Sequence, residues 1–202
     1  MFIGKYNKSV ILTYIGLISA AVGIYFAFND MLSYSMICLI ISGICDLFDG
    51  KVARMCKRND EEKEFGVQID SLVDVISFLA LPCCIGLKIL IDLPKVLNLV
   101  FVFYMLAGII RLAWFNMNSN KDEAVKYYMG LPVTYAALII PLVYTINLIC
   151  KSSFSYIYFC TYLIIGLAFI LNIKIAKPKG IWYAIFAILA IAIITLIIMI
   201  GL

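Results

Sequence analysis

Histidine is absent from the 202 residues, and charged side chains make up only 14% of them. Without histidine the chain lacks the commonest general base and the commonest zinc ligand, and it cannot form a Ser-His or Cys-His nucleophile pair. Acid–base chemistry must therefore use a carboxylate, lysine, tyrosine or cysteine. The shortage of charge also argues against a soluble domain, in which about a quarter of the residues are charged.

A cysteine framework is missing as well. The chain has seven cysteines, an odd number, and none of them forms a Cys-x-x-Cys motif. Most lie in apolar runs, where cysteine behaves as a small hydrophobic residue. We therefore expect reduced packing residues rather than disulfides or metal ligands.

Long apolar runs dominate what is present. Hydrophobic residues make up 65% of the chain, and the mean hydropathy is +1.07. At about 20 residues per transmembrane helix, this length predicts six to eight spans in a single domain over residues 1–202. The expected fold is an all-α polytopic transmembrane bundle. The apolar runs lie near residues 9–28, 31–52, 67–91, 95–116, 131–150, 154–173 and 180–201.

The basic residues predict an orientation with the N-terminus in the cytoplasm. With each residue assigned to its nearest loop, three basic residues fall outside (Lys88, Lys95 and Lys151). The others fall on the cytoplasmic side: Lys5, Lys8, Lys51, Arg54, Lys57, Arg58, Lys63, Arg111, Lys121, Lys126, Lys174, Lys177 and Lys179. This positive-inside bias predicts a multi-pass protein of the cell membrane. An odd number of spans would place the C-terminus outside.

Two further stretches are interpreted as structural. The mixed-charge segment 55–65 is expected to be a solvated polar loop. Trp182 and Tyr183 are expected to belong to an interfacial aromatic belt rather than to a binding site, because such rings gather at the membrane surface.

Four carboxylates interrupt the apolar pattern. Asp46 and Asp49 are three residues apart, and Asp70 and Asp74 are four apart, so each pair shares one face of a helix. A charged side chain in hydrocarbon costs roughly 2.5–3.5 kcal/mol on insertion scales, so the cluster needs compensation. Oxygen-only ligands favour Mg²⁺ or Mn²⁺, with Ca²⁺ as the alternative. Two such cations can hold a diphosphate, and the cluster is expected to face the cytoplasm.

Residues near the first pair suit a bulky phosphorylated ligand. Gly50 and Ala53 are small enough to let a ligand approach the backbone. Arg54 follows, and its guanidinium can bind a phosphate in a bidentate manner. Ser77 continues the face of the second pair and offers a hydroxyl.

These residues together resemble the signature of the CDP-alcohol phosphotransferase family, over residues 46–74. The matching positions are Asp46, Asp49, Gly50, Ala53, Arg54, Gly66, Asp70 and Asp74. The gap between Arg54 and Gly66 is longer than in the usual pattern, which weakens any transfer of nucleotide contacts from that segment.

Other blocks resemble the phosphatidylserine synthase branch of that family. They are the run 70–78 with Pro82 after it, the segment from Arg111 to Asn116, and Gly130-Leu-Pro132. Trp114 stands where that branch has a second arginine. The matching blocks cover roughly residues 43–136.

The resemblance implies a six-helix catalytic core with one or two extra spans, and a homodimer. It implies transfer of a phosphatidyl group from a CDP-diacylglycerol-type or CDP-archaeol-type lipid to L-serine, giving phosphatidylserine and CMP. It assigns two divalent cations to Asp46, Asp49, Asp70 and Asp74, with Asp74 also as the general base. Gly50, Ala53 and Arg54 would bind the nucleotide diphosphate. No nucleic-acid partner is expected.

Several alternatives stay open. Ser77, Arg111 and Asn116 are candidates for contacts to serine or to a lipid phosphate. Arg111 could equally extend to the membrane interface without any ligand. The acceptor could be glycerol phosphate or inositol instead of serine, and a more remote alternative is a cation or proton-coupled transporter that uses the same carboxylates.

Overall fold

The computed structural model of the chain describes residues 4–5, 7–119, 127–151, 155–176 and 180–202. Its main helices are α1 (Ile11–Phe28), α2 (Leu32–Met55), α3 (Asp60–Asp74), α4 (Leu81–Ile89), α5 (Leu99–Ser119), α6 (Ala136–Cys150), α7 (Ser155–Ile170) and α8 (Ile181–Gly201). A π-helix, η2 (Val75–Ala80), joins α3 to α4, and short 3₁₀ helices cover Lys8–Val10, Lys95–Asn98 and Val133–Tyr135. The predicted all-α bundle is confirmed.

The helices lie where the apolar runs placed them. With α3, η2 and α4 counted as one continuous segment, each of the seven expected spans contains a main helix. Five segments are long and apolar enough to cross a bilayer: Lys8–Phe28, Asp60–Ile89, Lys95–Asn118, Val133–Cys150 and Ile181–Gly201. α7 is apolar but shorter, and α2, which carries the first carboxylate pair, is not among the five. Lys121, Lys126, Lys177 and Lys179, which entered the predicted orientation, lie outside the described residues.

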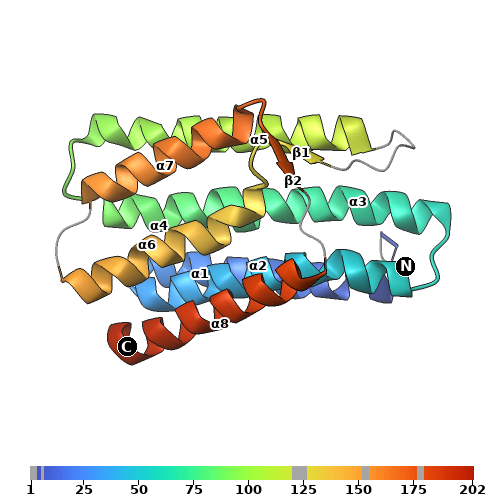
Figure 1. Cartoon of the computed structure of the whole chain (residues 1–202), viewed down its shortest axis with the longest axis horizontal. Helices are drawn as coiled ribbons and strands as arrows, with labels where there is room; N and C mark the ends of the chain where they lie inside the picture. Colours follow the sequence, from blue (N-terminus) through green and yellow to red (C-terminus); the bar gives the residue numbers. More distant parts are fainter. Residues whose placement is uncertain (1–3, 6, 120–126, 152–154, 177–179) are drawn as a thin grey trace.

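The helices run side by side along one axis (Figure 1). α1 packs along α2, and α5 packs along α7, while the α3–α4 segment lies between these two pairs. α8 packs against α2 and α6. The N-terminus and the α2–α3 connection share one end of the bundle, and the C-terminus lies at the other.

α1 and α2 approach closely because small residues line their interface. A Cβ placed on Gly23 would lie 2.9 Å from Cys38 Cβ, closer than real Cβ atoms come. Hydroxyl groups then bond across the gap: Ser35 donates to the Gly23 carbonyl at 2.8 Å. In a bilayer the hydrophobic effect does not drive helices together. Close packing of small residues and hydrogen bonds between helices stabilise their association instead.

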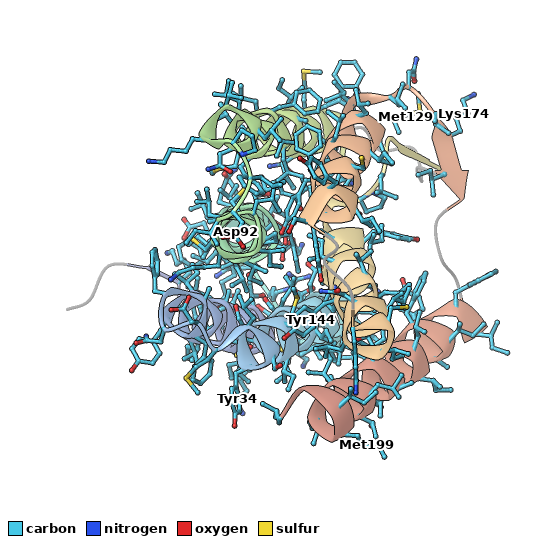
Figure 2. The ribbon with its side chains drawn as sticks, turned by 90° about the vertical axis from the view of Figure 1, so that its left-hand side faces the viewer. Tyr34, Asp92, Met129, Tyr144, Lys174 and Met199 are labelled. Atoms are coloured by element: carbon cyan, nitrogen blue, oxygen red, sulfur yellow. The ribbon has the colours of Figure 1, made fainter. Side chains whose placement is uncertain are left out.

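Polar contacts join further segments of the bundle at two places, near Tyr144 and near Met129 and Lys174, which are labelled in the end-on view (Figure 2). At the C-terminal end, the Tyr144 hydroxyl of α6 lies 2.9 Å from Ser33 Oγ of α2, which donates to the Gly201 carbonyl of α8. Elsewhere, β1 (Tyr127–Met129) and β2 (Lys174–Ala176) form a short antiparallel ribbon in which Met129 pairs with Lys174.

The expectation that residues 55–65 form a loop is wrong for most of that segment. α3 begins at Asp60, and Asn59 caps it through a reciprocal pair of hydrogen bonds with Glu62. Such a capping box satisfies two amide groups that would otherwise lack partners, which stabilises a helix start in a charged sequence. Only a short connection therefore separates α2 from α3.

The π-helix after Asp74 depends on two buried tyrosines. In an α-helix the Phe78 carbonyl would accept from the nitrogen of residue 82, but Pro82 has no N–H. The Tyr104 hydroxyl of α5 donates to the Phe78 carbonyl instead, at 2.7 Å. The Tyr162 hydroxyl of α7 donates to the Pro82 carbonyl at 2.6 Å. These bonds connect the carboxylate-bearing segment to the α5–α7 pair.

Replacing Tyr104 with phenylalanine should therefore destabilise the bundle by about 1 kcal/mol, because the Phe78 carbonyl loses its donor in an apolar interior. The measurement is the thermal unfolding midpoint of the purified protein in detergent. Tyr156→Phe is the matched control, since Tyr156 is 64% exposed on α7. An equal shift in both variants would contradict the assigned bond.

Candidate functional site

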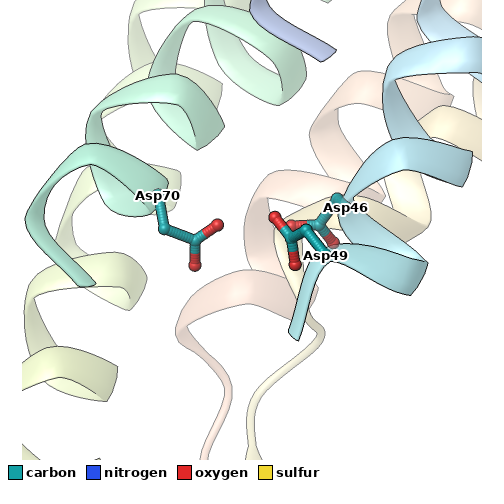
Figure 3. Close-up of side chains that lie close together, drawn as sticks. All are labelled: Asp46, Asp49 and Asp70. Atoms are coloured by element: carbon teal, nitrogen blue, oxygen red, sulfur yellow. The ribbon is translucent and has the colours of Figure 1, made fainter. Parts of the chain in front are cut away.

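The four carboxylates meet between two neighbouring helices. Asp46 and Asp49 project from α2, and Asp70 projects from α3 toward them (Figure 3). One oxygen from each of these three residues lies within 4.8 Å of the others. Asp74 lies one turn after Asp70 and lines the same cavity, although it is not part of this close trio. The two carboxylate pairs therefore line one cavity between α2 and α3.

Such close carboxylates repel one another, and burial strengthens the repulsion because little water screens it. Asp49 is only 9% exposed. A cation among the three oxygens would remove this repulsion. Two oxygens on one Mg²⁺ lie at most about 4.2 Å apart, twice the usual metal–oxygen distance, and those on Ca²⁺ slightly farther. The trio therefore fits a hard divalent cation after small side-chain movements.

A cavity of about 330 Å³ opens beside the carboxylates. Its charged lining residues are the four aspartates, Lys51, Arg54 and Arg111, which belong to α2, α3 and α5. The 3₁₀ helix Val133–Tyr135, α6 and α8 contribute apolar or aromatic residues, namely Val133, Tyr135, Leu138, Tyr183, Phe186 and Ala190. A ligand in this cavity would thus meet both strong charges and hydrocarbon or rings.

The structure separates the other predicted site residues into two groups. Gly50, Arg54 and Arg111 line the large cavity, and Ala53 is not among its lining residues. Arg111 is 7% exposed and its guanidinium lies 5.1 Å from the centre of the Phe115 ring. Arg111 is therefore held within the bundle and does not extend to the interface.

Ser77 and Asn116 lie outside the large cavity. Ser77 is fully buried and lines a second, much smaller cavity together with the four aspartates. Ser77 lies within the π-helix that follows Asp74. Asn116 donates to Ser71 Oγ at 2.8 Å, which ties α5 to α3.

Several lining residues were not predicted from the sequence. Lys51 lies inside the signature but was interpreted only as an orienting charge, and Thr134 and Tyr135 follow the Gly-Leu-Pro block. The interfacial assignment of Tyr183 is wrong, because the residue lines the cavity from α8. Phe186 lies one turn farther along, and its ring packs edge-on against Tyr135 at 5.5 Å. The spacing of Tyr183 and Phe186, one helical turn apart, was the sequence pattern that could have indicated a shared aromatic face.

The Gly130-Leu-Pro132 block positions this wall. The Gly130 amide donates to the Ile173 carbonyl and the Leu131 amide to the Ala168 carbonyl, each at 2.9 Å. Gly130 has a positive φ of +73°, and a Cβ there would lie 2.3 Å from the Phe169 carbonyl oxygen. The backbone is thus fixed against the end of α7, and Pro132 and Val133 emerge directly over the cavity.

Comparison with known proteins identifies a matching family and several similar proteins. The sequence profile of the CDP-alcohol phosphatidyltransferase family matches residues 6–197. A CDP-diacylglycerol–serine O-phosphatidyltransferase of Helicobacter pylori is 31% identical over 105 residues, 52% of this chain and 43% of the relative. An archaetidylserine synthase of Methanothermobacter thermautotrophicus is 31% identical over 139 residues (69% and 58%).

A CDP-diacylglycerol–serine O-phosphatidyltransferase of Saccharomyces cerevisiae is 34% identical over 120 residues, 54% of this chain and 41% of the relative. The chain spans about half the length of the curated relatives it matches. Bacterial, archaeal and yeast proteins are therefore each similar to part of this chain.

Replacing Gly130 with alanine should destabilise the protein by about 2 kcal/mol or more, because the new Cβ meets the Phe169 carbonyl and the backbone is left-handed. The thermal unfolding midpoint in detergent measures the effect. Gly180→Ala is the matched control: Gly180 also has a positive φ, but its added Cβ meets nothing within 4 Å. If the two variants lose the same stability, the close contact at Gly130 has no role.

Proposed function

The chain belongs to the CDP-alcohol phosphatidyltransferase family, and we propose that it transfers a phosphatidyl-type group from a CDP-linked lipid to L-serine. The donor is a CDP-diacylglycerol-type or CDP-archaeol-type lipid, and CMP is released. The observation that carries the proposal is the cavity whose lining combines carboxylates and basic side chains with apolar and aromatic residues. The serine acceptor is supported by the names of the bacterial, archaeal and yeast relatives.

The donor's diphosphate would bind at the charged lining residues. Lys51 and Arg54 both line the cavity close to the aspartates, and both can neutralise phosphate oxygens. Gly50 lies on the same stretch of α2, lines the cavity and leaves room for the nucleotide to approach the backbone. Ala53 would contribute only through its small size beside this stretch. The apolar lining residues of α6 and α8 would take the lipid end of the donor.

Asp46, Asp49 and Asp70 would hold divalent cations, Mg²⁺ or Mn²⁺ with Ca²⁺ as the alternative, and Asp74 would complete the ligand set. When bound, such cations neutralise the diphosphate and stabilise charge that develops on the oxygen atoms of the transferred phosphate. The fit rests on the three oxygens within 4.8 Å of one another and on their carboxylate chemistry.

Asp74 would act as the general base. Its carboxylate accepts the proton of the serine hydroxyl, whose oxygen forms a bond to the phosphorus next to the lipid. The bond from that phosphorus to the oxygen it shares with CMP breaks, and CMP leaves with the electron pair. Arg111 would bind the serine carboxylate, because it lines the cavity as a nearly buried cation. Ser77 and Asn116 have no direct part in this scheme.

The setting of this reaction is also part of the proposal. The protein would be a single-domain, multi-pass protein of the cell membrane that works as a homodimer, with the cavity facing the cytoplasm. The described basic residues near the α2–α3 connection, Lys51, Arg54, Lys57, Arg58 and Lys63, favour this orientation by the positive-inside rule. No feature of the cavity specifically favours ion transport.

Purified protein supplied with a CDP-lipid donor and Mn²⁺ should release CMP with L-serine and not with glycerol 3-phosphate or inositol. Chelation of the metal should abolish the release. The measurement is CMP formation against this panel of acceptors, with D-serine as a test of acceptor fit. Release with glycerol 3-phosphate or inositol alone would refute the serine assignment, and metal-independent release would refute the role of the cations.

Asp74→Asn should lower kcat by about 100-fold to 10,000-fold, because the amide cannot accept the serine proton. Binding of the CDP-lipid should persist, since Lys51 and Arg54 are unchanged. Turnover and donor binding are measured separately on the same preparation. Asp92→Asn is the control, because Asp92 lies in the α4–α5 connection away from the cavity. Full activity of Asp74→Asn would exclude the base role.

A further inference from the structure

The interface between α1 and α2 contains a series of hydroxyl groups, and most of them bond to backbone. Ser19 donates to the Cys38 carbonyl at 2.9 Å, Ser35 to the Gly23 carbonyl at 2.8 Å, and Ser42 to the Gly16 carbonyl at 3.0 Å. These bonds fix the register of the two helices. They stabilise packing and have no contact with the carboxylates.

Thr13 behaves differently from these serines. Its hydroxyl donates across the same interface to the Asp49 carboxylate, with 3.1 Å between Thr13 Oγ1 and Asp49 Oδ2. Thr13 is 6% exposed and Asp49 is 9% exposed. Among these four described hydroxyl groups, Thr13 donates to a carboxylate of the site and the three serines donate to backbone carbonyls.

The other helical threonines show what a threonine does without such a partner. Thr145, Thr161 and Thr195 each donate to the carbonyl four residues earlier in their own helix, at 2.8–2.9 Å. That local bond is the usual choice for threonine within a helix. Thr13 lies near the start of α1 and bonds instead to a different helix. Its orientation is therefore set by Asp49.

Thr13 cannot act on a ligand directly. It is absent from the lining of the large cavity and instead lines the small cavity, about 10 Å³, on the other side of the aspartates. Any effect of Thr13 on chemistry must therefore pass through Asp49. In metal sites, partners of this kind orient the ligating carboxylate and fix which oxygen faces the ion.

We propose that Thr13 is a positioning residue for the divalent-cation site: its hydroxyl occupies Asp49 Oδ2 and leaves the other oxygen directed to the ion. This inference rests on the proposed function, because it takes Asp49 as a metal ligand. A branched side chain at this position adds precision, since threonine is stiff about its first side-chain torsion. α1 would thus contribute to the metal site although none of its residues touches the ion.

The test is Mn²⁺ binding to the purified full chain in detergent, measured by electron paramagnetic resonance of free Mn²⁺ without any substrate. Thr13→Val keeps the shape and removes the hydroxyl, and it should weaken Mn²⁺ binding by about 10-fold. Thr13→Ser keeps a hydroxyl at this position, so its Mn²⁺ affinity should lie within about threefold of that of the unmodified protein. This change is clearly smaller than the loss expected for Thr13→Val.

Ser35→Ala is the packing control. It removes a buried hydroxyl bond of the same α1–α2 interface that ends on a backbone carbonyl. It should lower the thermal unfolding midpoint and leave Mn²⁺ affinity unchanged. In turnover assays, Thr13→Val should raise the Mn²⁺ concentration needed for half-maximal activity, and excess Mn²⁺ should restore kcat without changing the KM for serine.

Two results would overturn the inference while leaving the proposed function intact. The first is unchanged Mn²⁺ affinity in Thr13→Val. The second is equal weakening in Thr13→Val, Thr13→Ser and Ser35→Ala, which would assign the effect to packing. Failure of the metal site itself is recognised separately, because the unmodified protein would then bind no Mn²⁺ at all, and this would refute the inference together with the site.

Discussion

Mutual repulsion among carboxylates in an apolar bundle is the constraint on which the rest of the structure depends. Asp46, Asp49 and Asp70 bring oxygens within 4.8 Å of one another where little water can screen them. A protein without function would gain stability by replacing them. They can approach one another because only a short connection separates the end of α2 from the capped start of α3.

Polar bonds hold this costly cluster in place from both sides. On one side α1 fits tightly against α2 through small residues and hydroxyl groups, and Thr13 reaches Asp49. On the other side Tyr104 and Tyr162 bind carbonyls of the segment that follows Asp74. The carboxylates are therefore held by two independent sets of bonds. The hydroxyl donors of both sets, Thr13, Tyr104 and Tyr162, lie outside the family signature, which contains the carboxylates and the small residues beside them.

Sequence reasoning located the carboxylates and the spans because both follow simple periodicity. Spacings of three and four residues fixed the shared faces, and hydropathy fixed the helices to within a few residues. The segment 55–65 was assigned to a loop because its charge outweighed the Asn-x-x-Glu pattern of a capping box, which was readable at Asn59 and Glu62. Ser77 lines the small cavity with the aspartates and not the large one, a distinction that spacing along one helix does not make.

Other features depend on contacts between distant segments, which no local pattern encodes. Thr13 sits in an apolar run like any other helical threonine, and only the packing of α1 on α2 gives it Asp49 as a partner. Tyr183 was assigned to the interface because aromatic rings near helix ends often lie there. Its place in the cavity depends on how α8 lies across α2 and α6.

The lining of the cavity restricts which ligands it can bind. Charged groups come from α2, α3 and α5, while the 3₁₀ helix Val133–Tyr135, α6 and α8 contribute apolar or aromatic residues such as Tyr135, Leu138 and Phe186. A small polar solute would leave the apolar residues without a partner, and a plain hydrocarbon would leave the charged groups without one. A ligand that joins a charged group to an apolar body can contact both kinds of residue, and a nucleotide-linked lipid is one such molecule.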